Sequence, residues 1–250
     1  MFINFNFTSP NFSERILPIE YVVLHYTEMN FDDALAKLLC AEAEVSAHYL
    51  IKKNGEIFQL VGEDKIAWHA GKSCWHNLEK LNQNSIGIEL DNLGNEAFPN
   101  SQIDSCLKLC AYLKAKYKIP TPNFIGHSDI APSRKIDPGI FFDWQLFAKH
   151  GFGIWHNYKT EDLKELYSLN EKGSHVELLQ QKLQLLGYEI KITGIFDFQT
   201  NFVVRAFQAK FLPHILHKKG LDYYRNLSSI YTWCSSCDAC LNKLITYSLN

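Results

Sequence analysis

Two histidines and one aspartate in the first half of the chain could together bind a metal ion. His25 ends a short apolar run, His127 ends another, and Asp137 follows in a loop with two prolines and a glycine. Two histidines and a carboxylate are a common ligand set for catalytic zinc, with the fourth position left to water. Zinc lowers the pKa of bound water toward about 7 and polarises a carbonyl, so this set favours a hydrolytic site.

A hydrolytic site also needs a base and a group that stabilises negative charge. Glu89 lies inside the apolar run 85–90, where a carboxylate is costly unless it has a role or a partner. It could accept a proton from the attacking water and pass it to the leaving amine. Lys135 lies two residues before Asp137, and in an extended loop both side chains point to one side. Its ammonium could therefore face an oxyanion.

Each of these residues also has a simpler structural interpretation. A single histidine at a strand end is more often a satisfied core or surface residue, and His48 and His69 are equally available among the ten histidines. Glu89 could form an ordinary salt bridge, and Lys135 could be a solvated surface residue. Spacing alone does not choose between these interpretations.

The elements that would position these residues alternate between strands and helices. Apolar and β-branched runs predict strands at 21–26, 47–52, 56–61, 85–90 and 124–127, the second and third forming a hairpin around Asn54-Gly55. Helical periodicity predicts helices at 31–40 and 101–118, the longer one with Ser101 and Asp104 as a capping pair. This order predicts an α/β fold with a mixed central sheet flanked by helices.

The pattern changes near residues 158–170, which are charged and polar, and we expect a domain boundary there. The sequence is therefore divided into residues 1–160 and 161–250. In the second part, helices are expected at 174–186, with Ser174 and Glu177 as a capping box and Gly187 as C-cap, and at 199–211. This predicts a small helical C-terminal domain.

Composition excludes several classes of function. The net charge is −2, from 25 Lys and Arg against 27 Asp and Glu, so nothing suggests a nucleic-acid partner. No apolar run approaches the ~20 residues of a transmembrane helix, and residues 1–11 lack the features of a secretory signal.

Seven cysteines do not indicate a disulfide framework. Cys234, Cys237 and Cys240 could bind a metal or form a redox pair, but a helix with a cysteine-lined face is the simpler interpretation.

Seven short motifs follow one another over about residues 15–150. They are VVLHYT (22–27), VSAHY (45–49), GEIFQLV (55–61), AWHAG (67–71), NSIGIE (84–89), GHSDIAP (126–132) and KIDPG (135–139). Together they resemble the type 2 N-acetylmuramoyl-L-alanine amidases, the zinc family that includes the AmpD and AmiD enzymes. The resemblance implies the amidase and peptidoglycan recognition protein type of fold.

The resemblance also implies roles for particular residues. His25, His127 and Asp137 match the ligands of one zinc ion, Glu89 matches the acid/base glutamate, and Lys135 matches the lysine that stabilises the tetrahedral intermediate. Trp68 and His69 match a wall of the substrate groove, where substrate contact and a packing role both remain open. His48 is expected to be structural, with hydrogen bonds inside the sheet.

The second part of the chain resembles the small three-helix peptidoglycan-binding module. The pattern includes Leu186-Gly187-Tyr188, Thr193 to Asp197 and Ala206-Phe207-Gln208. AmpD-type enzymes generally lack this module, so it favours an AmiD-like enzyme. The alternative is that these helices only brace the first domain.

The implied function is zinc-dependent hydrolysis of the amide between N-acetylmuramic acid and the L-alanine of peptidoglycan stem peptides. Two alternatives remain: a non-catalytic peptidoglycan-binding protein, and a cytosolic amidase that recycles anhydro-muropeptides. The expected partners are peptidoglycan or muropeptides. The substrate favours the cell envelope (periplasm), whereas the missing signal sequence favours the cytoplasm.

Overall fold

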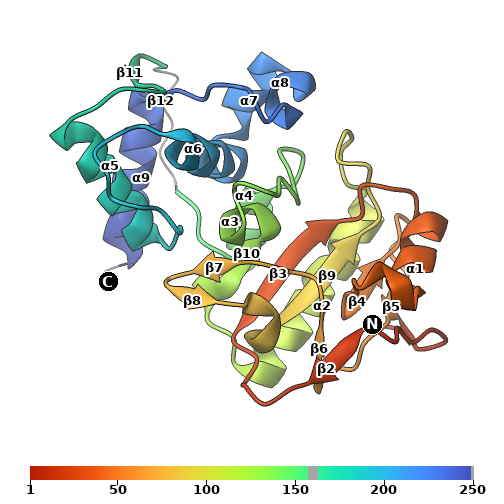
Figure 1. Cartoon of the computed structure of the whole chain (residues 1–250). Coiled ribbons are helices and arrows are strands. Elements are labelled where there is room, and N and C mark those ends of the chain that lie inside the picture. Colours follow the sequence, from red (N-terminus) through yellow and green to blue (C-terminus); the bar gives the residue numbers. More distant parts are fainter. Residues whose placement is uncertain (157–162, 249–250) are drawn as a thin grey trace.

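A six-stranded mixed sheet forms the centre of the first half of the chain. The structure is a computed structural model that describes residues 1–156 and 163–248 (Figure 1). The strand order is β1 (Ile3–Asn4), β5 (Ile57–Gln59), β4 (Tyr49–Ile51), β9 (Ser85–Leu90), β3 (Tyr21–Tyr26) and β10 (Phe124–Gly126). Only the β4–β5 pair is antiparallel within this sheet, which confirms the predicted hairpin and the mixed sheet.

Side chains from the two faces of β3 enter different cores, because successive residues of a strand point to opposite faces. Val22 and Leu24 pack with Leu109 and Leu113 of α2 (Asn100–Tyr117). Val23 belongs instead to a core shared with the C-terminal helices. Helix α1 (Phe31–Leu39) covers β4 and β5 through a third, smaller cluster, and α4 (Trp144–Lys149) contributes side chains to the same core as α2. Both faces of the central strands are therefore covered.

The C-terminal region, residues 163–248, is helical as predicted. Its three longer helices are α5 (Ser174–Leu186), α6 (Phe198–Phe211) and α9 (Ser235–Ser248). The described residues add the short α7 (Pro213–Lys219) and α8 (Leu221–Arg225), and a strand pair of β11 (Glu165–Tyr167) with β12 (Trp233–Cys234). The predicted boundary at 160/161 lies outside the described residues.

Several local details differ from the sequence prediction. Neither predicted capping pair forms: α2 follows Pro99 and α5 follows Gly173, without a side-chain cap in either case. Ser101 already belongs to the first turn of α2, and its hydroxyl donates to the carbonyl of Lys53. His127 does not end β10 but begins the short α3 (His127–Ile130), in a segment predicted as a loop. The C-cap at Gly187 is confirmed, with φ of 126°.

Three short strand pairs were not predicted. Besides β11–β12, they are β2 (Phe12–Glu14) with β6 (Lys65–Ala67), and β7 (Cys74–Trp75) with β8 (Leu78–Glu79). Strands of two or three residues are too short for an alternating pattern to stand out. Single-turn 3₁₀ helices also occur at Ala41–Ala43, Leu81–Asn84 and Thr121–Asn123.

The cysteine-rich segment forms the end of β12 and the first turns of α9. Cys237 and Cys240 are fully buried, and the Sγ atoms of Cys234 and Cys237 lie 3.3 Å apart. This agrees with the interpretation of a helix with a cysteine-lined face.

His48 is a buried link between three segments of the first domain. Its Nδ1 accepts from the Gly87 amide at 3.0 Å, and its Nε2 lies 3.1 Å from the carbonyl of Lys65. Since the Gly87 amide can only donate, Nδ1 is the acceptor, and the proton of the neutral ring is on Nε2, where the Lys65 carbonyl accepts it. The predicted structural role of His48 is confirmed by these contacts.

Replacement of His48 by Asn should reduce the acid sensitivity of folding. Burial lowers the pKa of His48 to about 3. The unfolded chain then binds this proton more tightly, so stability is lost as the pH falls from about 6.5 toward 3. Between pH 7 and pH 5 the loss is about 2 kcal/mol. Denaturant unfolding at both pH values measures this effect: the free energy of unfolding should fall by about 2 kcal/mol more in the wild type than in His48→Asn. An equal pH dependence of the two proteins would contradict the assignment.

Candidate metal centre and active site

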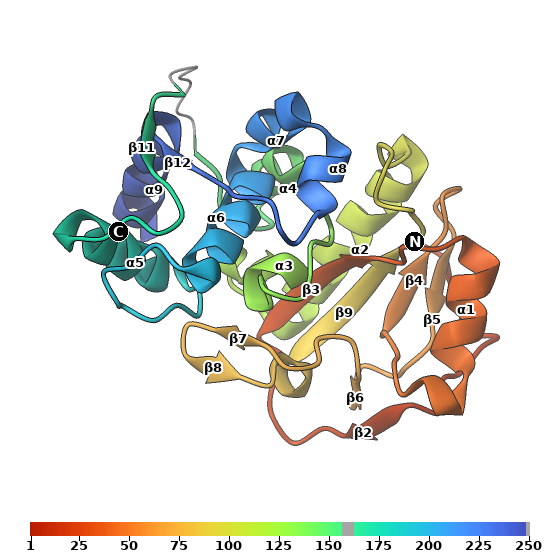
Figure 2. The ribbon, with the colours of Figure 1, turned by 45° about the horizontal axis from the view of Figure 1, so that its top comes forward.

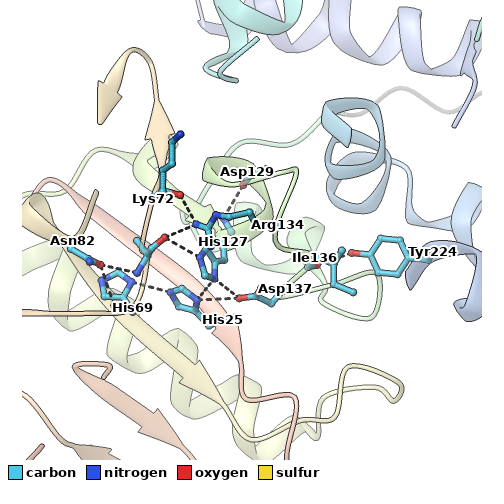
Figure 3. A network of polar contacts seen from close by, with 12 residues as sticks. His25, His69, Lys72, Asn82, His127, Asp129, Arg134, Ile136, Asp137 and Tyr224 are labelled. Carbon is cyan, nitrogen blue, oxygen red and sulfur yellow. Dashed lines mark hydrogen bonds and ion pairs between the residues drawn. The ribbon is translucent and has the colours of Figure 1, made fainter. Parts of the chain in front are cut away.

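The three predicted ligand residues meet at one point beside β3. His25 Nδ1 lies 2.9 Å from His127 Nδ1, and Asp137 Oδ2 lies 3.0 Å from each of these nitrogens (Figure 3). All three side chains are buried. Within the described residues, this is the group of His, Cys, Asp and Glu side chains whose atoms lie close enough to hold a metal ion.

A chain of hydrogen bonds fixes which nitrogen of His25 faces this point. The Leu81 carbonyl can only accept, so the Ser85 hydroxyl donates to it and accepts from His69 Nε2 at 3.2 Å. The neutral His69 ring then accepts at Nδ1 from His25 Nε2, 3.0 Å away. His25 Nε2 therefore carries the proton, and the lone pair of His25 Nδ1 points at His127 and Asp137.

The second histidine is oriented in a similar way. His127 Nε2 lies 3.2 Å from the carbonyl of Ala70 and donates to it, which leaves the lone pair of Nδ1 toward the other two ligands. Arg134 also donates to this carbonyl, at 3.1 Å. The Asn82 amide oxygen accepts from the backbone of His69 and Ala70, so the segment that supports both histidines is itself held in place.

This arrangement fits a bound cation. Two nitrogen lone pairs and a carboxylate oxygen converge at about 3 Å with no proton between them, and this repulsion is relieved by a positive charge at their centre. Bonds of about 2 Å, as zinc forms with nitrogen and oxygen, can span such a triangle. The outer nitrogens donate to a ring nitrogen and a carbonyl, as is usual for histidine ligands.

The charges of the three residues suit the same conclusion. Burial is the main cause that lowers the pKa of His25 to about 4, so the ring is neutral and able to bind metal near pH 7. Burial alone would raise the pKa of Asp137. The neighbouring His127 and His25 outweigh this effect and hold that pKa well below its usual range.

Glu89 lies beside the metal-binding cluster, and one of its carboxyl oxygens is unpaired within the described residues. In the parallel pairing of β3 with β9, Glu89 is the partner of His25. Its Oε2 is buried and has no hydrogen-bond partner within the described residues. Burial, followed by the charge of Asp137, raises the pKa of Glu89 to about 8. A carboxyl group with such a pKa can take up and release a proton near neutral pH.

A cavity of about 350 Å³ joins these groups. Six of the predicted site residues line it: Trp68, His69, Glu89, His127, Lys135 and Asp137. Lys135 is thus on the same side of its loop as Asp137, as its two-residue spacing suggested. Trp68 lies in this wall with its Nε1 donating to Ser13 Oγ at 3.0 Å.

His69 has a position that the sequence did not reveal. It lines the cavity, but it also contacts His25 through its Nδ1. An ideal Cβ on Gly87 would lie 2.4 Å from Cγ of His69, so the bare glycine in β9 is what lets this ring approach. Contact with substrate remains a prediction for His69, beside this observed contact with a ligand residue.

Replacement of His69 by Leu should weaken metal binding about 10- to 100-fold, the usual effect of losing an outer partner of a histidine ligand. The measurement is competition against a chelating dye, with Trp68→Leu as the matched neighbour. If His69 acts only on substrate, the variant will instead raise KM and keep the wild-type metal affinity.

The C-terminal region holds the segment between His127 and Asp137 at three places. The Asp129 carboxylate accepts hydrogen bonds from Lys210 Nζ at 2.6 Å and from the Tyr188 hydroxyl at 3.1 Å. The Lys210–Asp129 ion pair is buried. Arg205 donates to the carbonyl of Pro132 at 2.7 Å. Tyr224 donates to the carbonyl of Ile136, at 2.7 Å, directly before the ligand Asp137 (Figure 3).

None of these four supporting side chains was singled out by sequence reasoning as part of the site. Tyr188 is part of the peptidoglycan-binding pattern, but nothing in that pattern indicates a contact with α3. Tyr224 lies beyond residue 212, where the resemblance ends, so no sequence signal was available for it.

A buried cluster of two histidines and a carboxylate, open to a cavity and beside an unpaired carboxyl group, defines a metal-dependent hydrolase. Comparison with protein families gives the class more narrowly. Residues 15–140 match the N-acetylmuramoyl-L-alanine amidase family, and residues 172–213 match a peptidoglycan binding domain.

Individual proteins agree with these matches. The chain is 36% identical over 215 residues to N-acetylmuramoyl-L-alanine amidase AmiD of Escherichia coli, covering 78% of this chain and 75% of that protein. It is 36% identical over 160 residues to 1,6-anhydro-N-acetylmuramyl-L-alanine amidase AmpD of Haemophilus influenzae, covering 56% of this chain and 87% of the relative.

Among solved structures, that of E. coli AmiD with the substrate anhydro-N-acetylmuramic acid-L-Ala-D-γ-Glu-L-Lys matches with a TM-score of 0.75 and 29% identity. The match covers 95% of this chain and 98% of the other. The chain belongs to the N-acetylmuramoyl-L-alanine amidase family, and its activity is amide hydrolysis.

No helix in residues 1–156 or 163–248 combines the length and hydropathy that a membrane crossing requires.

Proposed function

We propose that this chain is a zinc enzyme that cleaves the amide between N-acetylmuramic acid and the L-alanine of peptidoglycan stem peptides. The observation that carries the proposal is the convergence of His25 Nδ1, His127 Nδ1 and Asp137 Oδ2 beside the unpaired oxygen of Glu89. His25, His127 and Asp137 would hold the zinc ion. When bound, zinc supplies a Lewis acid that makes water more acidic and polarises a carbonyl group.

The other roles belong to side chains of the cavity wall. Glu89 accepts a proton from the attacking water at its unpaired oxygen and then delivers that proton to the nitrogen of the leaving L-alanine. Lys135 donates from Nζ to the carbonyl oxygen as negative charge develops there. Trp68 and His69 contact the muropeptide along the groove.

The domain division supports a wall-associated enzyme. We assign residues 1–160 to catalysis and residues 161–250 to peptidoglycan binding, which the family match at residues 172–213 supports. A wall-binding domain is of use where intact peptidoglycan is present, so we place the enzyme in the cell envelope (periplasm). Pelleting with purified sacculi and fractionation of cells test these two assignments; a purely cytoplasmic enzyme that ignores sacculi would overturn both.

The catalytic proposal is tested by mass spectrometry of products from anhydro-N-acetylmuramic acid-L-Ala-D-γ-Glu-L-Lys and from intact sacculi. The protein is used as purified, after chelation, and after chelation followed by zinc. Release of free stem peptide that disappears with chelator and returns with zinc is the expected result. Cleavage of the anhydro compound alone would favour a recycling enzyme. No release from either substrate by metal-loaded protein would overturn the catalytic proposal and leave a peptidoglycan-binding protein.

A further inference from the structure

The C-terminal region supplies part of the wall of the catalytic cavity. Arg225, the last residue of α8, and Leu227 just after it both line this cavity together with Glu89 and Asp137. Figure 2 shows α8 next to the segment that leads from β9 into α2, and a hydrogen bond joins them, from Arg225 Nη2 to the carbonyl of Leu93 at 2.6 Å. A residue far from the catalytic motifs in sequence is thus a neighbour of the site.

The guanidinium of Arg225 has donors that the protein does not use fully. Its Nε is buried and has no hydrogen-bond partner within the described part of the chain. The same residues contain no carboxylate within ion-pair distance of it. A guanidinium has five N–H donors in a planar fork that matches a carboxylate, so this side chain lacks its natural partner.

Gly94 leaves room for the guanidinium of Arg225 beside the cavity. Gly94 has a φ of +74°, and an ideal Cβ there would lie 2.6 Å from the ring of Tyr26 and 3.0 Å from Arg225 Nη2. The absence of a side chain at Gly94 therefore lets Arg225 reach Tyr26, which directly follows the ligand residue His25. The cation is thus held next to the strand that carries the first metal ligand.

The other cavity arginine has its donors engaged. Arg134 bonds the carbonyls of Ala70 and Lys72, which support the histidine ligands. Lys135 is assigned to the reacting carbonyl. Arg225 is the arginine of this cavity that is left for a negative group of the substrate.

The substrate proposed above carries such a group close to the bond that breaks. In the sequence L-Ala-D-γ-Glu-L-Lys the glutamate is joined through its side-chain carboxyl, so its α-carboxylate is free. That carboxylate belongs to the residue directly after the alanine, one residue from the scissile amide. We propose that Arg225 binds the α-carboxylate of the γ-linked glutamate, so that the C-terminal region takes part in recognising the stem peptide. This inference rests on the proposed function.

The test uses two substrates that differ in this one group. The first is anhydro-N-acetylmuramic acid-L-Ala-D-γ-Glu-L-Lys, and the second has the α-carboxylate of the glutamate replaced by a carboxamide. For Arg225→Met, kcat/KM on the carboxylate substrate should fall about 10- to 100-fold, the cost of a lost charge-assisted hydrogen bond. On the carboxamide substrate it should change little. Arg225→Lys keeps the charge but not the planar fork of donors, so its kcat/KM on the carboxylate substrate should lie between those of the wild type and Arg225→Met.

Lys218→Met is the matched control, because Lys218 is an exposed cation of α7 that does not line the cavity. The retained activity of Arg225→Met on the carboxamide substrate shows that the variant is folded. An equal loss on both substrates would make Arg225 a support for Leu93 and Tyr26, and no loss on either would remove it from recognition; both results overturn the proposal.

Failure of the proposed function would look different. If the wild-type protein cleaves neither substrate, calorimetric binding of the free peptide L-Ala-D-γ-Glu-L-Lys and its carboxamide analogue still tests Arg225. Tighter binding of the carboxylate peptide, with the preference lost in Arg225→Met, would support the assignment without any turnover. Equal binding of both peptides by the wild type would overturn it.

Discussion

Glu89→Gln should reduce kcat about 10²- to 10⁴-fold, the usual contribution of a positioned general acid–base group. Glutamine has nearly the same shape as glutamate, so β9 and the neighbouring His25 should keep their positions. The carboxyl group it replaces is buried with an unpaired oxygen, and burial raises its pKa to about 8. Because ionisation of a carboxyl group is unfavourable at this buried position, its replacement by a neutral amide should leave stability unchanged or increased, while activity is lost.

Steady-state kinetics, denaturant unfolding and metal analysis of the same preparation separate these effects. Glu79→Gln is the matched control, because Glu79 is an exposed strand residue of β8. Full turnover by Glu89→Gln would remove Glu89 as the base. A joint loss of activity and metal would instead indicate that Glu89 helps to hold the ion.

Asp137→Asn should reduce metal affinity by more than about 100-fold, beyond the effect of losing an outer partner. The substitution keeps the size of the side chain but removes the negative charge that faces two histidine nitrogens at 3.0 Å. Two neutral nitrogens and an amide oxygen are a much weaker set for a divalent cation than a set that includes a carboxylate. Activity at limiting zinc should therefore be lost.

Dialysis against graded zinc concentrations, followed by metal analysis, measures this effect. Asp104→Asn is a suitable control, since Asp104 is exposed on α2. Unchanged zinc occupancy in Asp137→Asn would show that Asp137 is not a ligand, whatever its activity.

The sheet was predictable because its central strands are apolar on both faces. Runs such as Tyr21–Tyr26 and Ser85–Leu90 are buried on both sides, so their composition alone marks them as strands. The capping pairs failed for a different reason. Gly173 and Pro99 precede their helices directly, so α5 begins one residue and α2 two residues earlier than predicted, which places each serine inside the first turn.

The candidate site was predictable only through its motifs. Nothing in the spacing of the ten histidines separates His25 and His127 from His48 or His69. The structure distinguishes them by hydrogen bonds: His48 uses both ring nitrogens within the protein, whereas His25 and His127 each keep one lone pair for a common point. Arg225 and Tyr224 reach the site through tertiary packing alone, so no local pattern marks them.

The contacts of Lys210, Arg205 and Tyr224 with residues 129–136 have a consequence for chimeric enzymes. Wall-binding modules are attractive parts to exchange when an amidase is redirected to another bacterium. Here such an exchange would also remove the hydrogen bonds that hold the backbone on both sides of Lys135. A grafted module would have to restore a cation opposite Asp129 and a donor for the carbonyl of Ile136. Retargeting this enzyme is therefore safer by adding a module to the full chain than by replacing the one it has.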